Sequence, residues 1–199
     1  GKDEAFVVRR ERAAELGLER GILLPYAYRG AEVHRYTDAQ PQSLVIYPYR
    51  EGDNGQPVLI PESELRQVFP NIYKHLLSFR EQLRERMDSR KYYARGQDWY
   101  RHLRPGSFSY IRPLKLIFKG IDTVATVGLL QGNTAFNGAN SPAIVVNSGS
   151  SHSSNYLLGI LNSRLATYYF RGVCPAKLGG YHRFNANSIN SFPIRAINF

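Results

Sequence analysis

The chain has 199 residues, with 26 basic and 16 acidic side chains and a formal net charge of +10 at pH 7. Its 43% hydrophobic and 21% charged residues are typical of one large or two small globular domains and exclude a disordered chain. One cysteine, Cys174, excludes a disulfide framework and a cysteine-rich zinc module. No apolar window of about 18 residues and no basic leader occurs, so we expect no membrane span and a cytoplasmic location.

The ends of the chain suggest a piece of a longer protein. The sequence begins at Gly1, and its one methionine is Met87, so no initiator is visible. We therefore expect residues 1–199 to be one domain of a longer protein, with a possible sub-boundary near residues 89–112.

The first half of the chain predicts short strands followed by a long helix. Residues 5–8 form an apolar run suited to a strand, and residues 44–49 form a second one. The cluster Asp53-Asn54-Gly55 favours a tight turn that joins residues 44–49 to residues 57–60 as a hairpin. A helix is expected over residues 70–88, where the apolar residues recur every three or four positions: Ile72, Leu76, Phe79, Leu83 and Met87.

The second half predicts three strands and another helix. Residues 114–118, 124–130 and 143–147 are rich in β-branched residues, and the last two are separated by a polar loop at 131–140. Leu158, Leu161, Leu165 and Tyr168 recur at helical spacing, and Gly172 suits a C-cap. The pattern predicts an α+β fold with mixed or antiparallel sheets and two main packing helices, at about 70–88 and 155–171.

The basic excess lies entirely in the second half. Residues 1–88 carry 13 basic and 14 acidic side chains, whereas residues 89–199 carry 13 basic side chains and two acidic ones, Asp98 and Asp122. Arginine outnumbers lysine by 20 to 6, and the planar guanidinium suits phosphates and guanine edges. Together with 14 Tyr and 10 Phe, this indicates a polyanion-binding surface within residues 89–199; the alternative is a solubilising face.

No familiar catalytic motif occurs. No lysine after Lys2 has an acidic residue two positions before it, which argues against the Asp/Glu-x-Lys motif of metal-dependent nucleases. A nucleophile elbow, a P-loop, a dinucleotide fingerprint, a zinc-protease motif and an Asn/Asp-Pro-Pro-Tyr string are also missing. We interpret Cys174 as a structural cysteine and His182 as a base or phosphate contact rather than a general base, and we expect no metal site.

Several short strings occur in a characteristic order along nearly the whole chain. They are Gly1 with Ala5-Phe6-Val7, Tyr28-Arg29-Gly30 with Val33 and Arg35-Tyr36, residues 44–49, Tyr73-Lys74 with Leu76, Asp98-Trp99-Tyr100, residues 156–163, and Phe192-Pro193-Ile194. The ordered set resembles the TaqI-like C-terminal specificity domain. This is the target recognition domain of many adenine-specific DNA methyltransferases and of single-chain restriction-modification enzymes.

The resemblance implies a prokaryotic module that reads double-stranded DNA. A methyltransferase domain of the same parent chain would hold the other side of the duplex and flip the target base. That domain would bind S-adenosylmethionine, and a nuclease domain, where one is present, would use Mg²⁺. The fragment itself is expected to need no cofactor and to have no catalytic residue.

The resemblance places sequence specificity in residues 174–185, between the Leu-Asn-Ser helix and the closing Phe-Pro motif. The base-reading candidates there are Lys177, Tyr181, His182 and Arg183. Asn133 and Asn137, in the polar loop, are further candidates because an asparagine amide pairs with adenine through two hydrogen bonds. The alternative for residues 174–185 is an ordinary hairpin turn with exposed polar groups.

The phosphate-contact candidates are six of the cations between residues 89 and 122. They are Lys91, Arg95, Arg101, Arg104, Arg112 and Lys119. Trp99 and Tyr100, which lie among them, are expected to pack into the core.

The leading hypothesis is therefore a sequence-specific double-stranded DNA recognition module. A second hypothesis is a module that binds single-stranded nucleic acid or RNA, suggested by the alternation of arginine and aromatic residues. A third is a hydrolytic site around His182.

Overall fold

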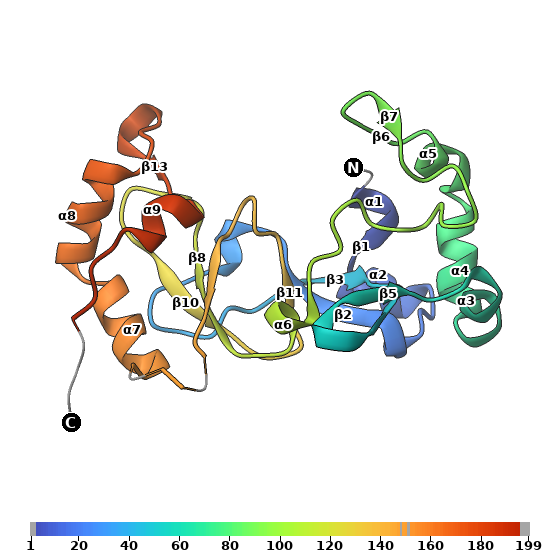
Figure 1. Ribbon diagram of the computed structural model, residues 1–199, viewed down its shortest axis with the longest axis horizontal. Helices are drawn as coiled ribbons and strands as arrows, with labels where there is room; N and C mark the ends of the chain where they lie inside the picture. The colour runs from blue at the N-terminus through green and yellow to red at the C-terminus, as the bar shows by residue number, and fades with distance from the viewer. Residues whose placement is uncertain (1–2, 148, 151, 196–199) are drawn as a thin grey trace. The chain divides into compact units, whose positions relative to one another are not determined.

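The structure, a computed structural model, describes residues 3–147, 149–150 and 152–195 and divides into two compact units (Figure 1). Unit 1 combines the chain up to Tyr26 with Gln42–Ile111. Unit 2 combines Ala27–Pro41 with the chain from Arg112 onward. The short segment Ala27–Pro41 therefore belongs with the basic second half of the chain, although it lies in the first half of the sequence.

Unit 1 is built on three antiparallel strands and a separate hairpin. The strand β3 (Ser43–Ile46) lies between β1 (Val7–Arg9) and β2 (Leu23–Ala27). The hairpin pairs β4 (Tyr49–Glu51) with β5 (Pro57–Leu59), and a second small hairpin pairs β6 (Met87–Asp88) with β7 (Lys91–Tyr92). The helices and 3₁₀ turns of this unit are α1 (Asp3–Phe6), α2 (Arg10–Glu15), α3 (Glu62–Val68), α4 (Pro70–Leu77), α5 (Arg80–Arg84), α6 (Phe108–Ile111), η1 (Arg20–Ile22) and η3 (Asp53–Gly55).

The hairpin predicted around Asp53-Asn54-Gly55 is present, but its first strand is shorter than expected. Asn54 and Gly55 have φ values of 57° and 73°, the left-handed conformation that this turn requires. The predicted strand at residues 44–49 is divided between β3 and β4, because Pro48 has no N–H to donate to a sheet and the chain turns at Tyr47 and Pro48.

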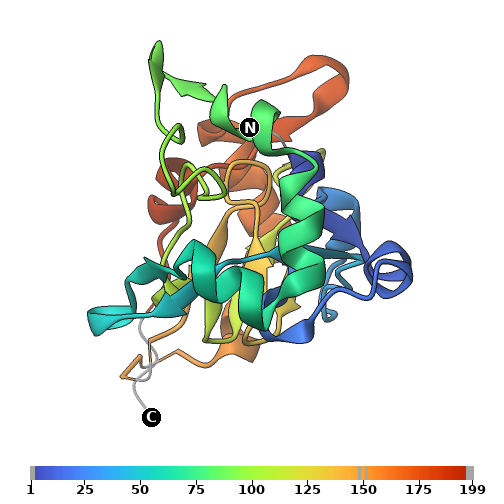
Figure 2. The same cartoon turned by 90° about the vertical axis from the view of Figure 1, so that its right-hand side faces the viewer.

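The predicted helix at residues 70–88 is two shorter helices, α4 and α5, of which α4 stands in front in Figure 2. The predicted apolar stripe does face the core as far as Leu83, since Ile72, Leu76 and Leu83 are fully buried. The helix is interrupted at Ser78, whose hydroxyl donates to the His75 carbonyl at 2.6 Å and competes with the backbone ladder. Met87 is wrongly included, because it begins β6 and is 50% exposed.

The centre of unit 1 is held by a buried arginine. Arg86 is 8% exposed, and its guanidinium donates to the carbonyls of Leu83, Trp99 and Arg101, each at 2.8 Å. These bonds fix the segment that contains Trp99 and Tyr100, which are buried as predicted.

Unit 2 is a three-stranded antiparallel sheet covered by helices. The strand β8 (Lys115–Phe118) lies between β10 (Val127–Leu130) and β12 (Ala143–Val145), and its residues Leu116 and Phe118 pack with the helical residues Leu158, Leu161 and Phe170. The other elements of this unit are β9 (Ile121–Asp122), β11 (Ala135–Phe136), β13 (His182–Arg183), α7 (Ser154–Leu161), α8 (Arg164–Val173), α9 (Ala186–Asn190), η2 (Gly30–Glu32) and η4 (Leu178–Gly180).

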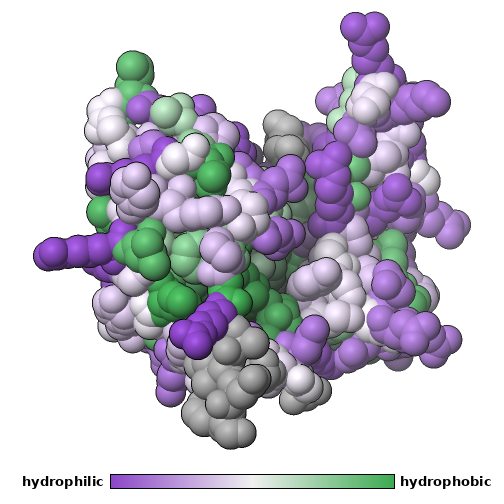
Figure 3. Space-filling model, turned by 60° about the vertical axis from the view of Figure 1, so that its left-hand side comes forward, coloured by the Kyte–Doolittle hydropathy of each residue, from purple (hydrophilic) through white to green (hydrophobic). Residues whose placement is uncertain are grey.

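The predicted helix at residues 155–171 is also divided, into α7 and α8. Ser163 caps α8 by accepting a hydrogen bond from the Ala166 N–H at 3.0 Å, so the helical phase restarts there. Leu165 and Tyr168 consequently leave the predicted apolar stripe and are 67% and 80% exposed. Figure 3, with the side that carries α7 and α8 turned forward, shows hydrophobic residues among hydrophilic ones on this face.

The predicted α+β class with antiparallel sheets is confirmed, and the helices differ from the prediction in where they break. Within residues 3–147, 149–150 and 152–195, no helix combines the length and apolar character needed to cross a membrane.

Candidate nucleic-acid interface

Residues 174–185 form a hairpin that projects from unit 2, with η4 at its tip (Figure 1). The Lys177 N–H donates to the Tyr181 carbonyl at 2.7 Å, and the Arg183 N–H donates to the Pro175 carbonyl at 2.9 Å. Gly179 and Gly180 have φ values of 74° and 77°, which residues with a side chain adopt only at a cost. Residues 174–185 therefore form a hairpin whose turn depends on two glycines.

The base of this hairpin is anchored in the core of unit 2. β13 pairs with β9 through His182 opposite Asp122, and the Phe184 N–H donates to the Gly120 carbonyl at 2.9 Å. The Phe184 ring is buried against Phe118 and Phe170. These contacts fix the base of the hairpin and so support its exposed tip.

A basic depression of about 560 Å³ lies beside the base of the hairpin. Four segments of unit 2 line it, and they contribute Tyr28, Arg29, Gly30, Ala31, Lys119, Gly120, Ile121, Ala139, Asn140 and Arg183. Three of these residues are cations and none is a carboxylate. The depression therefore has the charge and the hydrogen-bond donors that a phosphate or a base edge would need.

The three cations differ in their partners. The Lys119 ammonium lies 3.0 Å from an Asp122 carboxylate oxygen, so part of its charge is already balanced. Burial raises the pKa of Asp122, but hydrogen bonds from Lys119, the Thr123 backbone and the Thr126 hydroxyl outweigh this and lower it. Arg29 and Arg183 are exposed, and one Arg183 nitrogen donates a long 3.4 Å bond to the Ala139 carbonyl. The two arginines are the cations better placed to meet an anion.

The floor of the depression depends on a glycine. A Cβ atom at Gly120 would lie 1.7 Å from the Asn140 carbonyl oxygen, so only glycine lets these two segments approach. Residues 119–121 and 139–140 therefore lie against each other in the lining of the depression.

The structure brings several of the predicted site residues together. Arg183 and Lys119 line the basic depression, and His182 precedes Arg183 in β13, with its Nδ1 buried and without a hydrogen-bond partner among the described residues. Lys177 and Tyr181 are exposed on the two sides of the hairpin tip. These five residues belong to unit 2, four of them in the hairpin and Lys119 in the depression beside its base.

The predicted asparagines are engaged within the protein. The Asn133 carbonyl oxygen accepts a bond from the Arg112 guanidinium at 3.1 Å, and the Asn137 carbonyl oxygen accepts one from the Ala139 N–H at 3.3 Å. Neither asparagine lines the basic depression, nor does Arg112, although Asn137 begins the loop that supplies Ala139 and Asn140.

The remaining predicted cations belong to unit 1. Lys91 lies in the exposed β6–β7 hairpin, and the Arg95 guanidinium lies 3.3 Å from the centre of the Tyr92 ring. Arg101 is paired with Asp98 at 2.9 Å, and Arg104 is exposed. The predicted phosphate contacts are thus distributed over both units.

Sequence reasoning missed Arg29. The charge count favoured residues 89–199, whereas Arg29 comes from the segment Ala27–Pro41 that joins unit 2. The sequence signal for Arg29 is the Tyr28-Arg29-Gly30 string. In the structure the Glu32 carboxylate accepts hydrogen bonds from the Tyr28 and Arg29 N–H groups, which hold the Arg29 backbone beside the basic depression.

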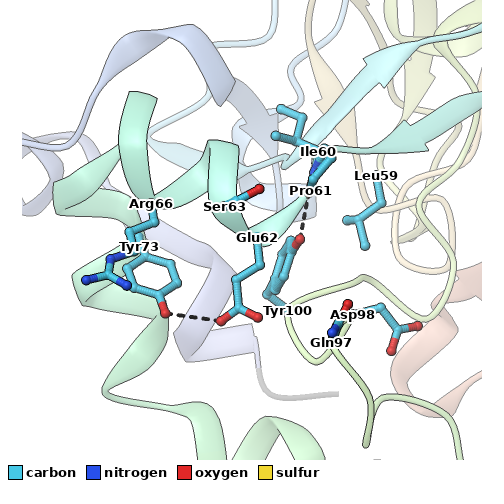
Figure 4. A pocket seen from close by; sticks show the side chains of 10 residues that line it. All are labelled: Leu59, Ile60, Pro61, Glu62, Ser63, Arg66, Tyr73, Gln97, Asp98 and Tyr100. Carbon is cyan, nitrogen blue, oxygen red and sulfur yellow. Dashed lines mark hydrogen bonds between the residues drawn. The ribbon is translucent and has the colours of Figure 1, made fainter.

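A second hollow, of about 500 Å³ in unit 1, has the opposite character (Figure 4). Glu62 and Asp98 contribute carboxylates to its lining. Glu62 accepts hydrogen bonds from the Tyr73 hydroxyl and the Trp99 indole N–H, both at 3.1 Å, and the Tyr100 hydroxyl donates to the Ile60 carbonyl at 2.6 Å. These side chains stabilise the fold, and the two carboxylates would repel a phosphate.

The described residues offer little for metal or nucleophilic chemistry. They contain no group of three or more His, Cys, Asp or Glu side chains placed to hold a metal ion. Cys174 is buried, and burial raises the pKa of its thiol, so the reactive thiolate is disfavoured.

Comparison of the sequence with known proteins places the chain in a family. The chain belongs to the TaqI-like C-terminal specificity domains, a family that matches residues 26–194, and the resemblance drawn from the sequence motifs is thereby confirmed. It is a specificity domain of the kind found in restriction-modification enzymes.

A similar protein is the type II restriction enzyme and methyltransferase RM.Eco57I of Escherichia coli. It is 25% identical over 182 residues, which cover 88% of this chain and 17% of that protein. The chain thus spans about a sixth of the length of this relative.

Proposed function

We propose that this chain reads a specific sequence in double-stranded DNA and has no catalytic activity of its own. The observation that carries the proposal is the basic depression, where Arg29, Lys119 and Arg183 meet from separate segments without a lining carboxylate. The adjoining hairpin is a two-stranded ribbon, an element narrow enough to enter a major groove. The family supports recognition as the role of this part of the parent chain.

The basic depression and the hairpin would have different roles in DNA binding. Arg29 and Lys119 lie at the base of the hairpin and would hold backbone phosphates, which position a protein without reading sequence. Arg183, Lys177, Tyr181 and His182 would reach base edges. A guanidinium can donate two parallel bonds to guanine, which is the commonest specific contact in the major groove.

The parent protein would supply the chemistry. We propose that it methylates adenine at N6 through an S-adenosylmethionine-dependent domain of the same chain, with or without a Mg²⁺-dependent nuclease. The relative RM.Eco57I, described as both a restriction enzyme and a methyltransferase, supports this proposal.

Selection from a randomised duplex library by the 199-residue chain at low salt tests the recognition role. We expect a defined sequence to be enriched. Arg183→Ala should change the base preference at one or two positions, whereas Arg95→Ala should weaken all sequences alike and reduce the salt slope by about one. Arg66→Ala, an exposed arginine beside the acidic hollow of unit 1, is the matched control for loss of charge.

Competition experiments separate the alternatives. Equal binding of random and selected duplexes in the parent enzyme would refute sequence-specific recognition. A preference for single strands or RNA over duplex at matched salt would favour the second hypothesis, in which exposed tyrosines stack on bases. Metal-dependent cleavage by the 199-residue chain that His182→Ala removes would instead indicate a hydrolytic site.

A further inference from the structure

The β6–β7 hairpin of unit 1 stands out from the rest of that unit in two views (Figures 1 and 2). Met87 pairs with Tyr92 and Asp88 with Lys91, which leaves Ser89 and Arg90 as the two turn residues. All six residues are exposed. No packing within the described part of unit 1 therefore explains the identity of the side chains at the tip.

The turn residues adopt a conformation that their side chains oppose. Ser89 and Arg90 have φ values of 49° and 67°, in the left-handed region where two-residue turns usually carry asparagine and glycine. Elsewhere among the described residues, non-glycine residues with positive φ occur singly, at Tyr36, Asn54 and Asn133. The left-handed conformation of Arg90 therefore costs conformational energy, and no contact in the described fold compensates for it. Such strained residues are often found at functional sites.

Cations lie at the tip of the hairpin and directly after it. The Arg95 guanidinium stacks on Tyr92, and the Arg95 carbonyl accepts two bonds from the Arg84 guanidinium, at 3.2 and 2.9 Å. Arg90 and Lys91 add two charges at the tip, against the single carboxylate of Asp88. The tip is thus positive and is held at its base by the bonds from α5.

We propose that this hairpin is a second DNA contact, separate from the basic depression, and that Arg90 at its tip is the contacting residue. The inference rests on the proposed function. The Arg90 guanidinium would donate to a pair of acceptors on the duplex, which are either two phosphate oxygens or the O6 and N7 atoms of a guanine. Unit 1 would then contribute to recognition as well as unit 2.

The test compares three glycine substitutions in the 199-residue chain. Ser89→Gly and Arg90→Gly both relieve the turn, whereas Asn54→Gly, at the exposed turn between β4 and β5, is a control where asparagine already suits the left-handed conformation. The first two variants should raise the melting temperature by about 2–4 °C, and Asn54→Gly should leave it nearly unchanged. Only Arg90→Gly should weaken binding to the selected duplex, by about tenfold, so that a more stable protein binds less tightly.

The chemistry of the contact is decided by two further measurements. A phosphate contact predicts that Arg90→Gly reduces the salt slope by about one. A guanine contact predicts that 7-deazaguanine in the duplex weakens the wild-type chain but not the Arg90→Gly variant. If Arg90→Gly and Ser89→Gly bind the duplex equally well, the inference is wrong while the proposed function stands. If the wild-type chain binds no duplex, the proposed function itself fails.

Discussion

Gly120 shows how a single missing side chain shapes the basic depression. The carbonyl oxygen of Asn140 occupies the space that a Cβ atom would need. We predict that Gly120→Ala separates the two segments, lowers the free energy of unfolding by about 1–3 kcal/mol and weakens DNA binding at least tenfold.

Gly159→Ala is the matched control for this substitution. Gly159 lies in α7, and a methyl group added there would meet no atom of the described neighbouring residues within 4 Å, so alanine should stabilise the helix by about 0.5–1 kcal/mol. Urea unfolding followed by circular dichroism, together with a DNA titration, measures both effects. Equal responses of the two variants would contradict a special role for Gly120.

His102 makes unit 1 sensitive to acid. Its ring lies among Phe6, Tyr47 and Tyr49, and Nε2 lies 2.9 Å from the Ile46 carbonyl, which requires a proton on Nε2. Burial, aided by the nearby Arg86 charge, lowers the pKa of His102 to about 4, although the bond to Ile46 and the charge of Asp3 oppose this. The folded protein therefore keeps this imidazole neutral in weak acid.

The pH dependence follows from this lowered pKa. The unfolded chain, with a histidine pKa of about 6.5, binds the proton more readily, so unit 1 should lose stability as the pH falls from about 6.5 to 4. Fluorescence of the buried Trp99, the one tryptophan of the chain, follows unfolding of unit 1. His102→Gln retains an N–H donor and should show a shallower pH dependence over that range; an unchanged slope would contradict the assignment. The lowered pKa of His75 remains in both proteins and cancels in the comparison.

Charge counting shows that the basic excess lies in residues 89–199, but it cannot tell which cations are buried or bound within the protein. Lys115 is fully buried and donates to the Pro113 carbonyl at 2.8 Å, and Arg171 donates to the Thr123 carbonyl at 3.3 and 3.0 Å. The sequence shows that these side chains are charged. The burial of Lys115 and the pairing of Arg171 with Thr123 depend on contacts between distant segments, which no local pattern encodes.

At the scale of elements, Asn162 joins a helix to a strand. Its side chain accepts a bond from the Val127 N–H and donates to the carbonyls of Val127 and Leu158, each at 2.9 Å. Arg35 adds bonds to the same residue, so the segment Ala27–Pro41 is tied to the end of α7. The asparagine in the Leu-Asn-Ser string therefore holds three parts of unit 2 together.

Ser163, the next residue, is the N-cap of α8 and offers a direct test of that arrangement. Ser163→Ala removes the cap on the Ala166 N–H and should lower the free energy of unfolding of unit 2 by about 1 kcal/mol. Ser163→Asp keeps an acceptor at the N-terminus and should retain wild-type stability. Calorimetry measures both, and an Ala variant as stable as the Asp variant would contradict the capping role.

The sequence pattern predicts an element well where the apolar residues and the element itself have the same extent along the chain. The strands at β8, β10 and β12 are predictable because each contains a short run of mainly apolar residues. The breaks at Ser78 and at Asn162 escape prediction because an apolar stripe continues across them in sequence, and the interruption is made by polar side chains that bond to the backbone. A hairpin turn at residues 174–185 is one of the two interpretations that the sequence allows, whereas its anchoring by β9 has no local sequence signal.

At the scale of the whole molecule, the charge is less one-sided than the sequence halves suggest. Because Ala27–Pro41 joins unit 2, that unit carries 10 basic and 3 acidic side chains, and unit 1 carries 16 and 13. The difference between the units lies in the scarcity of carboxylates rather than in the number of cations. Long-range attraction of DNA should therefore favour unit 2, where few negative charges oppose the phosphates.

The salt dependence of DNA binding distinguishes surface cations from the buried ones. Each phosphate contact contributes about 0.9 to the slope of log K against log salt concentration. Arg29→Ala should therefore reduce the slope by about one. Lys115→Met, an equal loss of formal charge, should leave the slope unchanged, because Lys115 is fully buried and cannot meet a phosphate. Burial lowers the pKa of Lys115 to about 8, so the measurement belongs at pH 7, where each variant has lost one charge. Equal slopes for the two variants would show that net charge, and not the position of Arg29, governs binding.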